Sequence, residues 1–159
     1  MQPLAELRTS SGTATLRRAA REDLPAIVGL LLDDPLGAGR EGAELTPYVR
    51  AFDAIDADPA HLLLVAEAGG QVVATMQLTF LPGLARRGAR RAQIEAVRVH
   101  ADFRGSGLGR ALITWATGEA RRRDCALVQL TSDKQRPDAH RFYARLGFVA
   151  SHEGFKLAL

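Results

Sequence analysis

Cys125 is the single cysteine of this 159-residue chain, which excludes an internal disulfide. The sequence also lacks any apolar run near the ~18 residues that a membrane-spanning helix requires. Its first residues, MQPLAELRTSSGTA, have no basic start followed by an apolar core, and so do not resemble a secretory signal. We therefore expect a cytoplasmic protein with no membrane partner, in which Cys125 is a small buried residue.

Lysine is scarce as well, because Lys134 and Lys156 are the only two among 21 basic residues. The remaining basic residues are arginines, whose planar guanidinium suits phosphate binding. The net charge of +3 is too small to indicate a nucleic-acid partner by itself. A nucleic-acid-associated protein remains an alternative through the arginines at 86, 87, 90 and 91, and it predicts strongly salt-dependent binding. The four histidines, at 61, 100, 140 and 152, have no ligand spacing, so we expect no metal site.

The chain has no repeats or linkers, and we expect one domain over residues 13–159 after a flexible tail over 1–12. Periodicity predicts helices near 24–31, 45–55, 108–123 and 137–147, and strands near 13–19, 61–68, 71–80, 92–99 and 126–132. Gly69 and Gly70 join two of these strands as a hairpin, and residues 148–159 are expected to form one or two further strands. This order predicts an α/β (α+β) fold, a mixed sheet with helices on both faces.

A glycine-rich loop, RGSGLGR over residues 104–110, lies between a predicted strand and a predicted helix. Strand, glycine turn and helix present unpaired backbone amides to an anion, and a pyrophosphate is the natural ligand. A P-loop would end in Gly-Lys-Ser/Thr, which is absent. A dinucleotide-binding loop would need a glycine where Arg110 stands, and an acid about 20 residues later. A tight turn that binds nothing is the remaining alternative.

Two segments resemble the signatures of the GNAT superfamily of N-acetyltransferases. Residues 104–109 match R/Q-x-x-G-x-G/A, and AHRFYARLGF over 139–148 is similar to A-x-x-x-Y-x-x-x-G-F. The resemblance covers residues 13–159. It implies a largely antiparallel mixed sheet of six to seven strands, flanked by about four helices and splayed where acetyl-CoA binds. It also implies transfer of an acetyl group from acetyl-CoA to a primary amine.

The resemblance assigns the cosubstrate to two neighbouring segments. The backbone of Val97, Arg98 and Val99 is implied to pair with the pantetheine arm, as an additional strand would, at a β-bulge that the resemblance also implies. The pyrophosphate is implied to lie on the loop formed by Arg104, Gly105, Ser106, Gly107, Leu108, Gly109 and Arg110. One position departs from the family pattern, because Arg136 occupies a slot where relatives commonly have asparagine. That substitution puts the usual asparagine contact to the cosubstrate in doubt, although an arginine can reach a phosphate.

Amine acetylation needs a base and an acid, because alkylammonium groups have pKa values near ~10 and the leaving thiolate gains from a proton donor. Tyr143 lies at the tyrosine of the second signature and is the candidate acid. Its position on an apolar helical stripe also suits simple packing. Glu95 interrupts the apolar run before Val97 and is the candidate base, directly or through water; a salt-bridged acid is the alternative. His100 is a weaker candidate base.

We expect a direct transfer through a tetrahedral intermediate, because neither signature contains a cysteine. The runner-up interpretation is a non-catalytic coenzyme A-binding or sensing module. The sequence does not identify the acceptor, which is a small-molecule or peptide amine. The segment LDDPLGAGREGAE, over residues 32–44, joins the two early helices, and the resemblance implies that it shapes the acceptor pocket. Its acids, Asp33, Asp34, Glu41 and Glu44, are candidates for attracting a cationic amine, and a solvated loop is the alternative. The resemblance leaves a homodimer open, because relatives are commonly dimers.

Overall fold

The computed structural model describes residues 2–34, 37–42 and 44–159. The chain divides into two compact units, residues 1–129 and 130–159, and each is described by itself. The elements are, in chain order, β1 (Ala5–Thr9), β2 (Gly12–Arg18), η1 (Arg21–Asp23), α1 (Leu24–Leu32), α2 (Thr46–Ala57), β3 (His61–Ala68), β4 (Gln71–Leu81), α3 (Ala85–Gly88), β5 (Arg90–Val99), η2 (Ala101–Phe103), α4 (Leu108–Arg122), β6 (Cys125–Leu130) and α5 (Pro137–Arg145).

The sheet follows chain order, β1-β2-β3-β4-β5-β6, over the residues that the structure describes. Strands β1 to β5 are successive antiparallel neighbours, and helix α4 provides the crossover from β5 to β6. The predicted mixed, largely antiparallel sheet of six to seven strands is confirmed. Five α-helices are present in the described chain instead of about four, because the turn Ala85–Gly88 at the tip of the β4–β5 hairpin is counted as α3.

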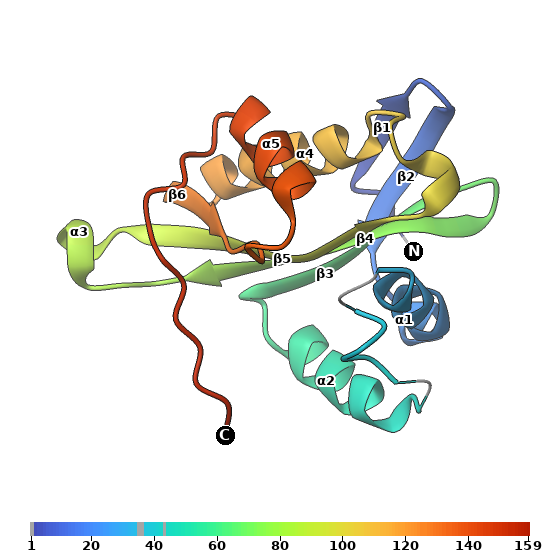
Figure 1. The fold of residues 1–159 in the computed structure, drawn as a ribbon, viewed down its shortest axis with the longest axis horizontal. Coiled ribbons are helices and arrows are strands. Elements are labelled where there is room, and N and C mark those ends of the chain that lie inside the picture. Colours follow the sequence, from blue (N-terminus) through green and yellow to red (C-terminus); the bar gives the residue numbers. More distant parts are fainter. Residues whose placement is uncertain (1, 35–36, 43) are drawn as a thin grey trace. The chain divides into compact units, whose positions relative to one another are not determined.

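Helices cover both faces of this sheet in the first unit. Helix α4 lies on one face, whereas α1 and α2 lie on the other (Figure 1). The apolar stripe of α4 packs against buried residues of the sheet, and burial of each leucine contributes about 1.5–3 kcal/mol. The buried members of that stripe are Leu108, Leu112, Ile113, Ala116 and Ala120. No helix within the described ranges is long and apolar enough to cross a membrane.

Part of the expected flexible tail over 1–12 is instead the first strand of the sheet. Residues 5–9 form β1, which pairs with β2 in antiparallel register and buries Leu7. The turn between the two strands is closed by Thr9, whose side chain donates a hydrogen bond to the carbonyl of Gly12 at 2.8 Å. Gly12 adopts a φ of +115°, a conformation that favours glycine. The N-terminal residues are therefore held by a hairpin.

The prediction of strands over 148–159 is wrong. These residues are all described, and they form neither helix nor strand. The alternation of Phe155, Leu157 and Leu159 is typical of a strand, but an alternating segment becomes one only where a neighbouring strand pairs with it. Within the second unit, α5 and the last residue of β6 are the regular structure, so no such neighbour is present among its residues.

Candidate functional site

Strand β5 contains a β-bulge in the middle of the predicted pantetheine strand. Arg98 pairs with Thr75 of β4, and Glu95 pairs with Gln77, so one residue of β4 lies opposite two of β5. Ala96, inside the bulge, has a φ of +52°, in the left-handed region that non-glycine residues rarely adopt. A bulge bends its strand and re-aims the local backbone. The bulge implied by the resemblance is therefore present, although the sequence contains no glycine to indicate it.

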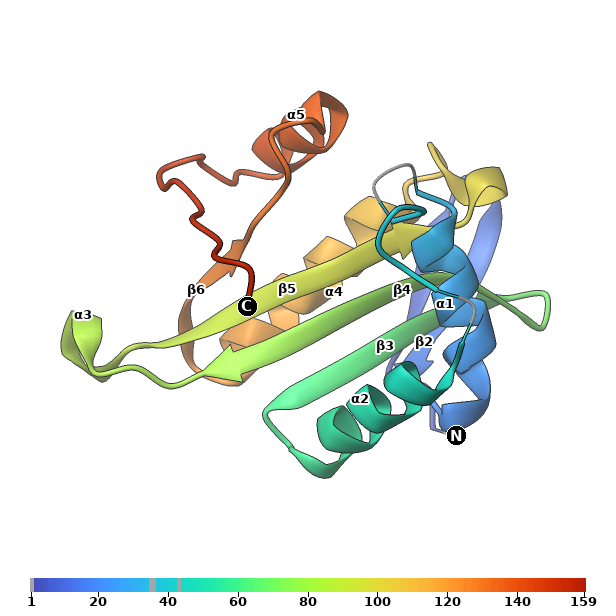
Figure 2. The same cartoon turned by 60° about the horizontal axis from the view of Figure 1, so that its bottom comes forward.

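The bulge also brings Glu95 and Arg98 to the same face of the sheet. Residues three apart in a regular strand point to opposite faces, because side chains alternate. The partners of these two residues, Gln77 and Thr75, are two apart on β4 and share a face. The extra residue of β5 therefore places a carboxylate and a guanidinium on one face. This is the face along which α1 packs against β4 and β5 (Figure 2).

Glu95 is exposed. Beside it lies what we call the polar row, formed by His61, Thr79 and Gln93. His61 Nδ1 lies 2.9 Å from Thr79 Oγ1, and Thr79 pairs with Gln93 of β5. Gln129 of β6 donates a hydrogen bond to Gln93 Oε1 at 2.6 Å. An accessible carboxylate beside hydrogen-bonding side chains suits the recognition and deprotonation of an amine.

The backbone groups of Val97 and Val99 face away from β4. The amide of His100 donates to the carbonyl of Val73 on β4 at 2.8 Å, so His100 faces that strand. Backbone groups alternate in direction along an antiparallel ladder, which turns those of Val97 and Val99 toward the other side. This geometry suits pairing with an extended ligand at that edge of β5.

The glycine loop turns sharply from β5 into α4. Gly105 and Gly107 have φ values of +77° and +90°, and a Cβ at either position would meet nothing within 4 Å. Glycine is therefore needed at both positions for backbone conformation and not for space. The first amides of α4 follow directly at Leu108, and the early amides of a helix have no intrahelical acceptor. The loop thus presents backbone donors at a helix N-terminus, as anion binding requires.

Two serines support this loop from the side of the N-terminal hairpin. Ser106 is buried, and its hydroxyl donates to the carbonyl of Phe103 at 2.6 Å. The carbonyl of Ser106 in turn accepts the amide of Ser10 at 2.9 Å. Ser10 follows β1, so the hairpin that replaces the expected tail fixes the glycine loop. Sequence reasoning missed this contact, which joins residues 96 positions apart.

The two arginines of the loop have different environments. Arg104 Nη2 contacts Asp33 Oδ2 at 2.7 Å and the Asp33 carbonyl at 3.1 Å, and its Nε donates to the carbonyl of Val99 at 3.1 Å. Arg110 is exposed and lines a groove between β1 and α4, together with Ser106 and Gly107. Arg110 therefore extends from the loop amides, whereas the side chain of Arg104 joins the loop to the end of α1.

Arg98 makes a similar link to Asp34, the residue that follows Asp33. Its Nη1 donates to the carbonyl of Val97 at 2.9 Å, and its Nη2 lies 3.4 Å from Asp34 Oδ2. Figure 2 shows α1 beside the end of β5, where these acids follow the helix. Asp33 and Asp34 are acceptor-side candidates on the sequence, which predicts neither of these pairings with arginine.

The remaining candidates of the first unit have structural contacts. The ring of His100 accepts the amide of Asp102 at 3.3 Å and packs edge-on against Phe103. Cys125 is half-buried, and burial raises the pKa of its thiol, which disfavours the reactive thiolate. Across the described ranges, no group of three metal-ligating side chains is found.

Tyr143 lies on α5 in the second unit, where its ring contacts Phe142 and Phe148 at centroid distances of 5.1 and 5.7 Å. Its carbonyl accepts the amide of Phe148 at 3.1 Å. Arg136 directly precedes α5, and its amide donates to the carbonyl of Asp133. Tyr143 and Glu95 belong to different units, so the structure does not bring these two candidates together in one described site.

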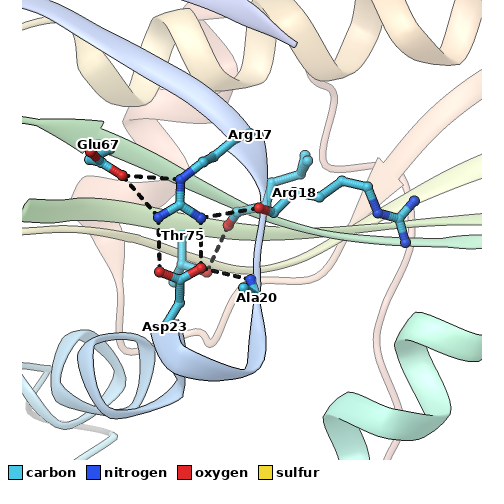
Figure 3. Close-up of polar contacts among 7 residues, drawn as sticks. Arg17, Arg18, Ala20, Asp23, Glu67 and Thr75 are labelled. Atoms are coloured by element: carbon cyan, nitrogen blue, oxygen red, sulfur yellow. Dashed lines mark hydrogen bonds and ion pairs between the residues drawn. The ribbon is translucent and has the colours of Figure 1, made fainter. Parts of the chain in front are cut away.

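An ion-pair network that the sequence analysis missed anchors the other end of α1. Arg17 of β2 donates two hydrogen bonds to Asp23, at 2.7 and 2.9 Å, and two to Glu67 of β3 (Figure 3). Asp23 directly precedes α1 and also accepts the amide of Ala20 at 2.7 Å. The hydrogen bond from Arg17 lowers the pKa of Asp23 and outweighs the opposing effect of burial. Acid–arginine pairs therefore flank α1 at both ends.

Comparison with known proteins gives concordant results. Residues 24–148 match the model of the acetyltransferase (GNAT) family. Aminoalkylphosphonate N-acetyltransferase of Salmonella typhimurium strain LT2 is 30% identical over 91% of this chain and 90% of its own. Glucosamine 6-phosphate N-acetyltransferase of Trypanosoma brucei brucei is 36% identical over 84% of this chain and 85% of its own. A solved structure from Bacillus halodurans C-125, described as a transcriptional regulator, is 48% identical, with a TM-score of 0.89 over 92% of this chain and 99% of that one.

Proposed function

Because the chain belongs to the acetyltransferase (GNAT) family, we propose that it transfers an acetyl group from acetyl-CoA directly to a primary amine. The observation that carries this proposal is the bulge of β5, which lies between an exposed carboxylate and the glycine loop. Acetyl-CoA would supply a thioester-activated acetyl group. Val97, Arg98 and Val99 would hold the pantetheine arm through their backbone, and the loop over residues 104–110 would hold the pyrophosphate through its backbone amides and the side chain of Arg110.

In this proposal Glu95 accepts the proton of the ammonium group, directly or through a water molecule. The free amine then forms a bond to the acetyl carbon, and the tetrahedral intermediate breaks its carbon–sulfur bond. Tyr143 returns a proton to the departing thiolate. The nitrogen then loses its second proton to the Tyr143 phenolate, which restores the phenol, and Glu95 releases the first proton to solvent. The amide product, the free thiol of coenzyme A and one proton result, without a covalent enzyme intermediate. Cys125 takes no part in this scheme.

We propose further that the acceptor is a small amine bearing a phosphorus oxyanion group. Aminoalkylphosphonate and glucosamine 6-phosphate, the acceptors named in the two curated relatives, share an amine and a phosphonate or phosphate. The polar row of Thr79, Gln93 and His61 beside Glu95 offers hydrogen-bonding groups to such a molecule. A homodimer in solution and a cytoplasmic location remain predictions that we carry from the sequence.

The test begins with calorimetric titration of acetyl-CoA, with NAD and ATP as controls. Thiol release is then measured with 2-aminoethylphosphonate and glucosamine 6-phosphate, each beside an amine that lacks the phosphorus oxyanion, ethanolamine or glucosamine. Selective acetyl-CoA binding and a higher kcat/KM for the phosphorylated or phosphonylated member of each pair support the proposal. Binding without turnover on any amine supports the non-catalytic coenzyme A-binding module instead. Preference for NAD or ATP overturns the cosubstrate assignment.

A further inference from the structure

We propose that Arg104 and Arg98 are positioning residues for the acceptor, because they attach the segment after α1 to the cosubstrate strand. This inference rests on the proposed function for the identity of the strand and of the acceptor side. Asp33 and Asp34, which directly follow α1, form what we call the acidic corner. The corner leads into the segment that precedes α2, which the family resemblance implies to shape the acceptor pocket.

The two arginines make the same pair of contacts: each binds one carbonyl of β5 and one of the two adjacent acids after α1. Arg104 joins the carbonyl of Val99 to the carboxylate of Asp33, at 3.1 and 2.7 Å. Arg98 joins the carbonyl of Val97 to the carboxylate of Asp34, at 2.9 and 3.4 Å. Each guanidinium therefore bridges one carbonyl of the predicted pantetheine strand and one acid of the corner. A guanidinium suits this role because its several donors are held in a fixed planar geometry.

The bulge of β5 lies directly before the two bridges. Val97 and Val99 have backbone groups that face away from β4, as derived above from the hydrogen bond between His100 and Val73. The bulge places the Arg98 side chain on the face where α1 packs, and only on that face can it reach the acidic corner. The feature that re-aims the cosubstrate strand thus also creates the link to the acceptor side.

From the acidic corner the contacts continue toward α2. Asp34 Oδ2 accepts the amide of Gly37 at 2.9 Å, and its carbonyl accepts the amide of Ala38 at 2.8 Å. The amide of Glu41 donates to the carbonyl of Gly37 at 2.9 Å. Glu41 Oε2 accepts the hydroxyl of Tyr48, on α2, at 2.7 Å. A hydrogen-bonded path therefore runs from β5 to the first turns of α2.

Gly37 shows how closely this turn lies against the end of α1. A Cβ added there would come within 2.0 Å of the carbonyl oxygen of Leu31, a contact that no real Cβ makes. The turn can therefore tolerate little displacement, and a change at the acidic corner is passed on to it. For the acceptor this means that its binding segment is held at a set position relative to the acetyl-bearing strand.

The test compares Arg104→Gln, Asp33→Asn and their combination, using purified full-length protein. We expect each single variant to raise the KM for the best acceptor about 5-fold, with the double variant no worse than either one, because both remove one interaction. The dissociation constant for acetyl-CoA, measured by calorimetry, should change less than 2-fold. Arg104→Lys should restore part of the loss, because lysine reaches the carboxylate but not both partners.

A second measurement does not depend on activity. Hydrogen exchange of the amides of Gly37, Ala38 and Glu41 should accelerate in Asp34→Asn. The matched control is Asp56→Asn, which removes an exposed ion pair with Arg18 that also has a separation of 3.4 Å; it should leave these amides unchanged. Thermal unfolding of every variant checks that the fold is retained.

The outcomes separate the two proposals. If Arg104→Gln weakens acetyl-CoA binding while Asp33→Asn does not, Arg104 acts on the pyrophosphate and the positioning role is overturned. Unchanged exchange in Asp34→Asn also overturns it. If the wild-type protein neither binds acetyl-CoA nor acetylates amines, the proposed function fails, whereas faster exchange at Gly37 would still demonstrate the physical link.

Discussion

At the scale of single residues, the site depends on side chains whose partners lie far away in the sequence. Arg104 and Asp33 are 71 positions apart, and no local sequence pattern predicts their contact. Glu95 was predicted because a charged residue interrupts an apolar run, which is a local signal. The left-handed conformation of Ala96 has no such signal, because alanine carries no conformational preference for positive φ.

Replacement of Glu95 tests the base directly. We expect Glu95→Gln to lower kcat at pH 7 by about 100-fold, the lower range for loss of a general base, because the amide cannot accept the ammonium proton. The acetyl-CoA dissociation constant from calorimetry should stay within 2-fold, since Glu95 lies outside the predicted pyrophosphate loop. Gln77→Asn, opposite Glu95 on β4, is the matched control for a polar change at this row. A kcat for Glu95→Gln equal to that of the control would assign Glu95 a structural role.

At the scale of elements, the hairpin and helix pattern was largely predictable, whereas the chain termini were not. Gly69 and Gly70 both have positive φ and close the β3–β4 hairpin, as their sequence signal indicates. The β1–β2 turn over Ser10 and Ser11 lacks such a signal, so the sequence predicts a tail where the structure has a strand. The strands expected over 148–159 failed for the opposite reason, because the pattern was present but a pairing neighbour was not.

The support that the β1–β2 turn gives to the glycine loop predicts an effect on the cosubstrate. Ser10→Pro removes the amide that donates to the Ser106 carbonyl, and we expect acetyl-CoA binding to weaken about 5-fold, the equivalent of one hydrogen bond. Ser10→Ala is the control, because it keeps that amide and loses only the weaker 3.3 Å contact of the hydroxyl. Calorimetry measures the acetyl-CoA dissociation constant of both variants, at a temperature where thermal unfolding shows each of them to be folded. Equal affinities for the two variants would show that the loop holds its shape alone.

The attachment of α1 to the sheet predicts a pH dependence of stability. The pKa of Asp23 is lowered by its hydrogen bond with Arg17, so its contribution is fully present above the unfolded-state value near 3.8 and is lost as pH falls through the lower folded-state value. Asp23→Asn should reduce the free energy of unfolding by about 2 kcal/mol at pH 7 and by less at acidic pH. Urea unfolding between pH 3 and 7 measures this.

The exposed neighbour Glu22 provides the control for that experiment. Glu22→Gln should leave the free energy of unfolding within 0.5 kcal/mol of the wild type at pH 7, as surface substitutions usually do (about ±0.5 kcal/mol). A deficit of Asp23→Asn that stays constant from pH 7 to pH 3 would contradict a role for the ionised carboxylate. The remaining contacts of Arg17 with Glu67 would then account for the stability of the network.

At the scale of the whole molecule, the two units differ in how many side chains they bury. The first unit has a sheet with buried faces on both sides, whereas residues 130–159 bury none of their side chains fully. Chains below about 40 residues rarely fold without additional links, and α5 has only nine residues. A peptide of residues 130–159 should therefore give the far-UV circular dichroism of a disordered chain. Helical minima in water would show that this unit folds independently.

The bulge of β5 has a consequence for insertions and deletions. Removing Ala96 would return the strand to a regular ladder, in which Glu95 and Arg98 still share a face because they become two positions apart. The deletion also removes a left-handed alanine that costs about 1–2 kcal/mol. We expect a shortened protein that folds at least as stably by urea unfolding, yet loses acetyl transfer because its strand is straight. Retained turnover would show that catalysis does not need the bend. Deletion of Ala96 should therefore leave the free energy of unfolding equal or higher while it abolishes acetyl transfer.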